Sequence, residues 1–377
     1  MKPAHELAEI IALYSESFNH RYKPTVQVGK TFRAIGQCRT AALGGHVSVC
    51  TCCGTEQISY NSCRNRHCPK CQVTNREKWI MARESELLPV SYYHIVFTLP
   101  HCLNELFPLY EKEVYNSLFA AAWQTIQTFA ADPKYLEAKT GMVAILHTWG
   151  QQLWLHPHLH CIVPGGGITK SGKWKNCKHK EKYLYPKRAM SEVFRAKFIA
   201  VLRSKISIPQ RVAKKAFETN WVVYAKRPFG SPKTVVEYLG RYTHKIAISN
   251  HRLLEVNNQT VSFSFKDYRD AAKKKVTTIK GTEFLRRFAL HILPWGFIRI
   301  RHYGFLASKN KSTELNLAKE CLGQEKWEKT VKTWVQIAKE KLNYDPEICP
   351  HCKVKAMLLL RGILPLPPPQ YRFNYEQ

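Results

Sequence analysis

The segment that decides the fold is His156-Pro157-His158-Leu159-His160-Cys161-Ile162-Val163. Its histidines alternate with apolar residues, which is typical of a half-buried β-strand. Because successive side chains of a strand point to opposite faces, His158 and His160 share one face while Leu159 points into the core. Two imidazoles on one strand face provide half of a divalent-metal site. An isolated pair of this kind is usually structural, so a functional interpretation requires a nucleophile beside it.

The segment just before these histidines predicts a partner strand. If residues 142–151 and 157–163 form a hairpin, His147 and Gln151 lie on the face that carries the histidine pair. We expect Gln151 to be the third metal ligand, because it lies nearest the turn, with His147 as the alternative. His94, on an earlier predicted strand, is a weaker candidate.

Two tyrosines supply the candidate nucleophile. A serine and a proline at 231–232 suit the start of a helix, and that helix carries Tyr238 and Tyr242 one turn apart on one face. A phenol has a reference pKa near about 10, so it attacks poorly until its target is activated. A divalent metal bound to a phosphate oxygen provides that activation, and Arg241 and Lys245 can neutralise phosphate charge. Alone, the tyrosines would be interpreted as packing residues; the histidine pair favours catalysis.

The cysteines indicate zinc. Seven of the 13 cysteines fall between Cys38 and Cys71. In a reducing compartment, clustered cysteines are more often metal ligands than disulfides. Two Cys-x2-Cys pairs separated by 14 residues are typical of one tetrahedral zinc site. The predicted ligands are Cys50, Cys53, Cys68 and Cys71.

Other cysteines and histidines leave alternatives open. A second zinc site could be formed by Cys38, His46, Cys63 and His67. Alternatively, Cys38 and Cys63 stay free and His67 contacts DNA. A third pair, Cys349 and Cys352, resembles half of a zinc knuckle that no downstream pair completes. Cys321 could contribute to it, or the pair could be structural or vestigial.

The charge of the chain indicates a polyanionic partner. Its 377 residues include 58 Lys and Arg against 28 Asp and Glu, a formal net charge of +30. Nucleic acid is the commonest partner of such a chain, although a merely soluble basic protein is the alternative. No apolar run reaches the roughly 18 residues of a membrane span. The first residues lack the layout of a signal peptide, so we expect a cytoplasmic protein with no membrane contact.

Together the motifs resemble the HUH endonucleases. His158-Leu159-His160 matches their His-hydrophobic-His signature, Phe97-Thr98-Leu99 resembles their upstream strand motif, and Tyr238-x3-Tyr242 resembles their two-tyrosine motif. The arrangement is similar to transposases of the rolling-circle insertion-sequence group numbered ninety-one. A zinc module at 61–71 and a segment at 284–304 fit the same group, and the resemblance spans roughly residues 30–310.

The resemblance implies an α+β fold: an HUH core, in which helices flank an antiparallel sheet, with an N-terminal zinc-binding module and a helical C-terminal region. It implies Zn²⁺ in the module and Mg²⁺ or Mn²⁺ on His158 and His160, with Gln151 as the third ligand that we expect from the strand pattern. Tyr238, Tyr242 and Lys245 would be catalytic, cleaving single-stranded DNA to a 5′-phosphotyrosine and a free 3′-OH before strand transfer. The alternatives are a plasmid replication initiator or relaxase with the same chemistry, and a non-catalytic zinc-containing DNA-binding regulator.

The predicted organisation has three parts. Residues 1–88 hold an N-terminal helix and the zinc module, 89–310 the catalytic domain, and 311–377 helices and a Pro-rich tail. Strands are predicted at 92–99, 142–148, 158–163 and 245–248, and helices at 103–131, 312–321 and 325–342. The predicted DNA-contacting arginines are Arg64, Arg66, Arg241, Arg286, Arg287, Arg299 and Arg301.

Overall fold

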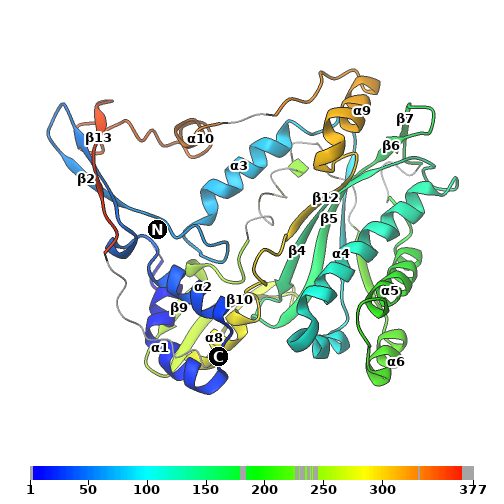
Figure 1. Ribbon diagram of the computed structural model, residues 1–377, viewed down its shortest axis with the longest axis horizontal. Coiled ribbons are helices and arrows are strands. Elements are labelled where there is room, and N and C mark those ends of the chain that lie inside the picture. The colour runs from blue at the N-terminus through cyan, green and yellow to red at the C-terminus, as the bar shows by residue number, and fades with distance from the viewer. Residues whose placement is uncertain are drawn as a thin grey trace.

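A computed structural model describes residues 3–178, 184–225, 229, 234–235, 238, 240, 245–329 and 332–366 of the chain. Helices and antiparallel sheets are interspersed along it (Figure 1), which confirms the predicted α+β class. None of the helices in these ranges is long and apolar enough to cross a membrane.

The central sheet has five strands. Their order is β12 (Ile300–Gly304), β4 (Gly141–Trp149), β5 (Leu155–Pro164), β3 (Tyr92–Thr98) and β8 (Val222–Ala225). Every neighbouring pair is antiparallel. The strands expected at 92–99, 142–148 and 158–163 are confirmed, and β4 and β5 form the expected hairpin. This hairpin lies at the centre of the sheet, with β3 beside it.

The two faces of this sheet differ in chemistry. Alternate residues such as Ile95, Phe97 and Leu159 point into the main hydrophobic core. That core is covered by α4 (Phe107–Ala131), α5 (Lys187–Arg203) and α6 (Gln210–Glu218), which lie on one side of the sheet in Figure 1. The residues between them, including the histidines, therefore face away from the helices.

A second core joins the N-terminal helices to a later part of the chain. Helices α1 (Leu7–Tyr22) and α2 (Val26–Gly36) pack against residues 247–292. In this core, Phe32 of α2 stacks on Phe288, with 6.2 Å between the ring centroids. That later part contains a three-stranded sheet and a helix: β9 (Leu253–Val256), β10 (Thr260–Asp267), β11 (Lys273–Lys280) and α8 (Gly281–Ala289). Residues 245–248, predicted as a strand, are loop, because β9 begins only at Leu253.

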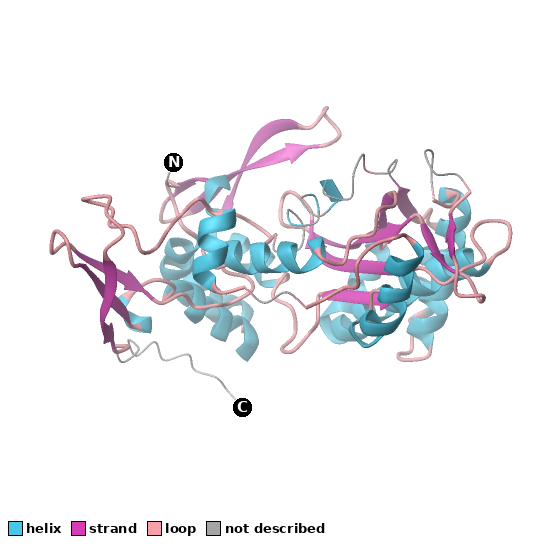
Figure 2. Ribbon diagram, turned by 90° about the horizontal axis from the view of Figure 1, so that it is seen from above, coloured by secondary structure: helices cyan, strands magenta, loops and turns pink. Residues whose placement is uncertain are grey.

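A third sheet joins segments from opposite ends of the sequence. β13 (Met357–Ile363) pairs with β1 (Gly45–Cys50), which also pairs with β2 (Glu56–Tyr60). We call these three strands the terminal sheet; it lies apart from the central sheet in Figure 2. The helical C-terminal region was predicted correctly only in part, since it also contains β13. Long-range pairing creates this strand, and a local sequence pattern cannot show such pairing.

The C-terminal helices are shorter than expected. Lys311–Leu315 form a π-helix that continues into α9 (Asn316–Cys321), which covers the helix predicted at 312–321. The helix predicted at 325–342 is present only as α10 (Trp334–Lys341), which packs beside α3 (Gln72–Glu84). The remaining short elements are η1 (Ala41–Leu43), η2 (His101–Leu106), η3 (Asn250–Arg252), η4 (Ser308–Asn310), β6 (Gly166–Ile168) and β7 (Trp174–Asn176).

A buried ion network ties the C-terminal region to the end of α3. The Glu86 carboxylate is 3% exposed and accepts hydrogen bonds from Arg83 and Lys311, each at 2.6 Å. Removing either cation would leave buried negative charge poorly compensated, which is strongly destabilising. A third hydrophobic core, which includes Leu88, Tyr92, Leu306 and Leu315, contains residues from both sides of positions 88 and 310.

This core therefore does not mark a boundary at either position. The division of the chain into three parts stays a prediction from the sequence.

Candidate functional site

Three histidines converge on the face of the central sheet away from α4 and α5. His147 on β4 is the register partner of His158 on β5, and His160 is two residues further along β5. One ring nitrogen from each lies within 4.8 Å of the other two. This spacing allows one metal ion to contact all three side chains.

The third member of this group differs from the one expected. The strand β4 ends at Trp149, and Gln151 lies in the turn beyond it. The Gln151 side chain accepts a hydrogen bond from the Lys266 backbone N–H at 3.3 Å. Our preference for Gln151 assumed that the strand alternation continues into the turn, and it does not. The structure instead brings His147, the alternative, to His158 and His160.

His94 supports this group from the neighbouring strand. It is 2% exposed, and its Nε2 lies 2.8 Å from Nδ1 of His160, with the two rings stacked. The Nδ1 of His158 donates to the His156 carbonyl oxygen at 2.6 Å. Bonds of this type fix a ring's orientation and leave the other nitrogen for a ligand. We expected His94 only as a weaker candidate, whereas it contacts the group directly. Side chains alternate between the two faces of β3. Once β3 pairs with β5, this alternation places His94 on the face that carries His158 and His160.

The surroundings favour neutral imidazoles. Burial lowers the pKa of His158 to about 4, and the nearby Lys245 ammonium contributes. Burial, followed by the charges of His147 and His158, holds the pKa of His160 far below its usual range. Neutral imidazole is the form that binds metal ions, so the donor set fits a divalent cation.

Tyr238 points at the histidine group. Its hydroxyl lies 3.3 Å from Nδ1 of His94, and its ring packs edge-on against that imidazole and at a tilt against Phe229. Tyr242 and Arg241 lie outside the described residues. The Lys245 charge acts on both His158 and His160, and partial burial, then Arg252 and Lys266, lower the pKa of Lys245. A phenol, a cation and three imidazoles therefore lie together.

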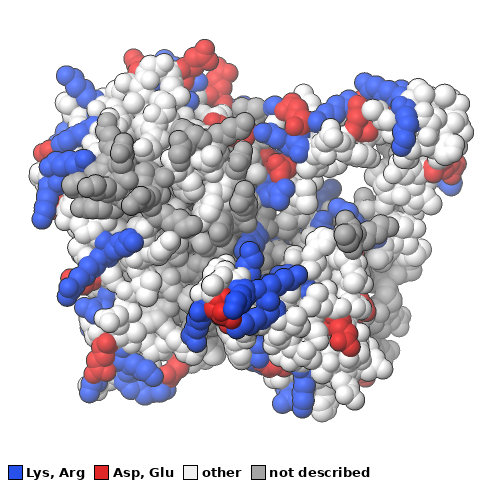
Figure 3. All heavy atoms as spheres, turned by 180° about the vertical axis from the view of Figure 1, so that it is seen from behind, with Lys and Arg blue, Asp and Glu red and all other residues white. Residues whose placement is uncertain are grey.

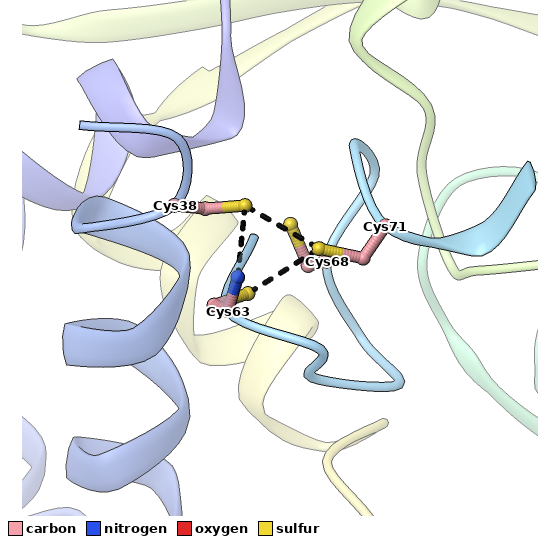
Figure 4. A group of neighbouring side chains, drawn as sticks. All are labelled: Cys38, Cys63, Cys68 and Cys71. Carbon is pink, nitrogen blue, oxygen red and sulfur yellow. Dashed lines mark hydrogen bonds between the residues drawn. The ribbon is translucent and has the colours of Figure 1, made fainter. Parts of the chain in front are cut away.

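Four cysteines form a compact group at the start of α3 (Figure 4). The members are Cys38, Cys63, Cys68 and Cys71, and their sulfurs all lie within 4.8 Å of one another. The Cys71 sulfur is 3.3 Å from that of Cys38 and 3.6 Å from that of Cys63. A tetrahedral ion with Zn–S bonds of about 2.3 Å holds its sulfurs about 3.8 Å apart. All four are free of disulfides, so this group fits a zinc ion.

The expected zinc quartet was wrong. Cys50 and Cys53 do not join Cys68 and Cys71; they lie in a separate group with Cys349 and Cys352. The reason is the terminal sheet, whose pairing of β1 with β13 brings the late cysteines to the end of β1.

The predicted second site is brought together only in part. Cys38 and Cys63 lie in a four-cysteine group that could hold a metal ion, but His46 and His67 belong to neither cysteine group. His46 lies on β1, in register with Gly362 of β13. His67 is buried, and burial lowers its pKa to about 3.

Several predicted DNA-contacting arginines have partners inside the protein. Arg66 donates to the carbonyl oxygens of Pro294 and Phe297. Arg287 is buried against Glu283 and lies over the Trp154 ring. These contacts indicate structural roles.

The others vary in exposure. Arg301 donates to Asn116 and lies over the Phe119 ring, which also indicates a structural role. Arg286 pairs with Glu283, and Arg299 donates to the Lys245 carbonyl oxygen. Arg64 is exposed. In the space-filling view of Figure 3, Lys and Arg side chains gather around the hollow near the middle of the face.

Comparisons with known proteins cover most of the chain. A family model described as "Putative transposase" matches residues 141–313, and one described as "Transposase zinc-binding domain" matches residues 10–99. The chain is 43% identical over 338 residues to "Putative transposase y4qJ" of Sinorhizobium fredii, with 84% of each chain covered. It is 31% identical over 332 residues to the "Transposase for insertion sequence element IS801" of Pseudomonas savastanoi pv. phaseolicola, covering 84% of this chain and 79% of that one. No solved structure matches the chain.

Proposed function

The chain belongs to the family of insertion-sequence transposases that carry an N-terminal transposase zinc-binding domain, and on this premise we propose that it cuts and rejoins single-stranded DNA through tyrosine. The observation that carries the proposal is the Tyr238 hydroxyl, 3.3 Å from His94, within a group of four histidines. A tyrosine buried merely for packing does not need a cluster of converging metal-binding side chains beside its hydroxyl.

The reaction uses the residues as follows. The Tyr238 oxygen attacks the scissile phosphorus, forming a 5′-phosphotyrosine as the bond to the 3′ oxygen breaks. The phenol proton reaches the departing 3′ oxygen through solvent, so the products are a covalent adduct and a free 3′-OH. Tyr242, expected one helical turn further on, would cut a second strand while the first 5′ end is held. Rejoining reverses the same step with a different 3′-OH.

The chain's own groups prepare this step. His94 holds the phenol by its Nδ1 and holds His160 by its Nε2, so it fixes the nucleophile relative to the ligand set. Lys245 supplies positive charge where the phosphate would lie. His147, His158 and His160 would hold Mg²⁺ or Mn²⁺. When bound, the cation withdraws charge from the phosphate and stabilises the transition state.

The first four-cysteine group has a separate role. Zinc on Cys38, Cys63, Cys68 and Cys71 would fix the end of α2 against the start of α3. Such sites contribute folding energy and take no part in the cut.

The proposal is tested with single-stranded oligonucleotides that carry the ends of the element. With Mg²⁺ or Mn²⁺, a substrate labelled at its 3′ end should become covalently attached to the protein and migrate with it on a denaturing gel. The same substrate labelled at its 5′ end should give a shorter, unattached product. EDTA should prevent both. Attachment of the 5′ label, or cutting with neither label attached, would contradict the 5′-phosphotyrosine.

Binding of single-stranded DNA should depend steeply on salt. The net charge of +30 implies many contacts between Lys or Arg and phosphate, and each contact releases counterions. An interface that neutralises about six phosphates should lose roughly 300-fold in affinity between about 50 and about 200 mM salt. Fluorescence anisotropy with a labelled oligonucleotide measures this. A flat dependence would show that base stacking, rather than charge, dominates binding.

A further inference from the structure

A second group of four cysteines lies at one end of the terminal sheet, and only half of it falls within a family match. Its members are Cys50, Cys53, Cys349 and Cys352, and their sulfurs lie within 4.8 Å of one another. Cys349 and Cys352 lie outside both matched segments, 10–99 and 141–313. We propose that these four thiolates bind a second zinc ion, which fastens the C-terminal strand β13 to the N-terminal strand β1.

The two cysteine pairs have the same backbone geometry. After Cys53, Gly54 has a φ of +69° and its N–H donates to the Cys50 carbonyl oxygen at 2.9 Å. After Cys352, Lys353 has a φ of +63° and its N–H donates to the Cys349 carbonyl oxygen at 3.0 Å. A left-handed residue at this point is uncommon for lysine, so the second turn adopts this conformation against its own preference.

A further hydrogen bond repeats in both turns. The Cys50 N–H donates to the Thr55 carbonyl oxygen at 3.0 Å, and the Cys349 N–H donates to that of Val354 at 2.8 Å. Each turn thus presents two sulfurs on the same side. The two turns face each other, with 3.6 Å between the sulfurs of Cys50 and Cys352 and 3.7 Å between those of Cys53 and Cys349. Cys50 and Cys53 are therefore the partner pair that the local sequence does not show for Cys349 and Cys352.

The distances fit a metal better than disulfides. A disulfide requires about 2.05 Å between sulfurs, and a tetrahedral zinc site about 3.8 Å. A set of four sulfur ligands suits zinc or iron among biological metals. Zinc needs no redox partner and is already implied by the family's zinc-binding domain, so we assign zinc.

The terminal sheet has little hydrophobic core among the described residues. Its small core has three buried residues, Cys50, Cys349 and Met357. Large apolar side chains on the strands are exposed instead, including Ile58 at 56% and Leu359 at 71%. A three-stranded sheet with so little buried surface is marginal in water, whereas metal binding adds directly to the free energy of folding.

The main test counts metal ions. The purified full-length protein should contain two zinc ions per chain by elemental analysis. X-ray absorption should show sulfur ligands at about 2.3 Å around zinc. The double variant Cys349→Ser/Cys352→Ser should contain one zinc ion, because the group at the start of α3 is untouched. Cys52→Ser is the matched control: Cys52 lies between Cys50 and Cys53, is exposed and belongs to neither group, so this variant should keep two.

A second measurement follows the strand itself. Arg361 lies in β13, paired with Val47, so trypsin should cut after it slowly in the zinc-loaded protein. In the double variant the cut should be about tenfold faster or more, because β13 opens locally. The Cys52→Ser protein should match the wild type.

Four results would overturn the proposal. They are one zinc ion per wild-type chain, two in the double variant, iron in place of zinc, or an intact mass showing disulfides among these cysteines under non-reducing conditions. The wild-type count decides the question even if the double variant folds poorly. None of these measurements depends on DNA cleavage.

Discussion

Replacement of both Tyr238 and Tyr242 by phenylalanine is expected to abolish the covalent adduct between the protein and single-stranded DNA. Phenylalanine keeps the ring that packs against His94 and Phe229 and removes only the hydroxyl. Loss of a nucleophile costs on the order of 10⁴-fold or more in rate, so the adduct should fall below detection. The measurement is the denaturing gel with a 3′-labelled oligonucleotide.

The single variants separate the two tyrosines. Tyr238→Phe should lose the first cut, because this hydroxyl faces the histidine group. Tyr242→Phe should still form one adduct but should not complete strand transfer. Tyr224→Phe, an exposed tyrosine on β8, serves as the control and should behave as the wild type. An adduct formed by the double variant at the wild-type rate would end the assignment of both residues.

Replacement of His160 by alanine is expected to abolish cleavage while leaving DNA affinity within about threefold, since few phosphate contacts depend on one imidazole. His160 is the histidine that contacts His94, His147 and His158 at once, so its loss removes a ligand and releases His94. His158→Ala should have the same effect on cleavage. Binding of Mn²⁺, followed by electron paramagnetic resonance, should weaken in both variants.

The third ligand can be identified in the same experiment. His147→Ala should reduce both Mn²⁺ binding and cleavage, whereas Gln151→Ala should retain them, because Gln151 is occupied with Lys266 in the turn. His20→Ala, at an exposed position on α1, controls for loss of a histidine elsewhere. Thermal melting of each variant checks the fold. Wild-type cleavage by His160→Ala, or loss of Mn²⁺ binding in Gln151→Ala alone, would contradict the assignment.

Local patterns in the sequence predicted the centre of the molecule well. Alternation placed His158 and His160 on one face, and a short connection made β4 and β5 a hairpin. The same reasoning failed at Gln151, because alternation holds only while the strand continues, and β4 ends at Trp149.

The cysteines show a different limit. Spacing along the chain suggested that neighbouring Cys-x2-Cys pairs share one ion, but the pairing of β1 with β13 decides which sulfurs meet. Cys50 and Cys352 are 302 positions apart, and nothing local signals their contact. Likewise, the sequence predicted that Arg66 contacts DNA. Its hydrogen bonds to the carbonyl oxygens of Pro294 and Phe297, 228 and 231 positions away, indicate a structural role.

The pairing of β1 with β13 also sets an order of events during synthesis. Ribosomes add about 5–20 residues per second, so β1 waits roughly 15–60 s for the strand that completes its sheet. During that time the hairpin of β1 and β2 exposes an unpaired edge, which is open to proteases and to pairing with other chains. A nascent chain that stops before Cys349 would contain the histidines and Tyr238 but would never close this edge. Completion of the terminal sheet therefore distinguishes a polypeptide that includes β13 from one released before β13 is made.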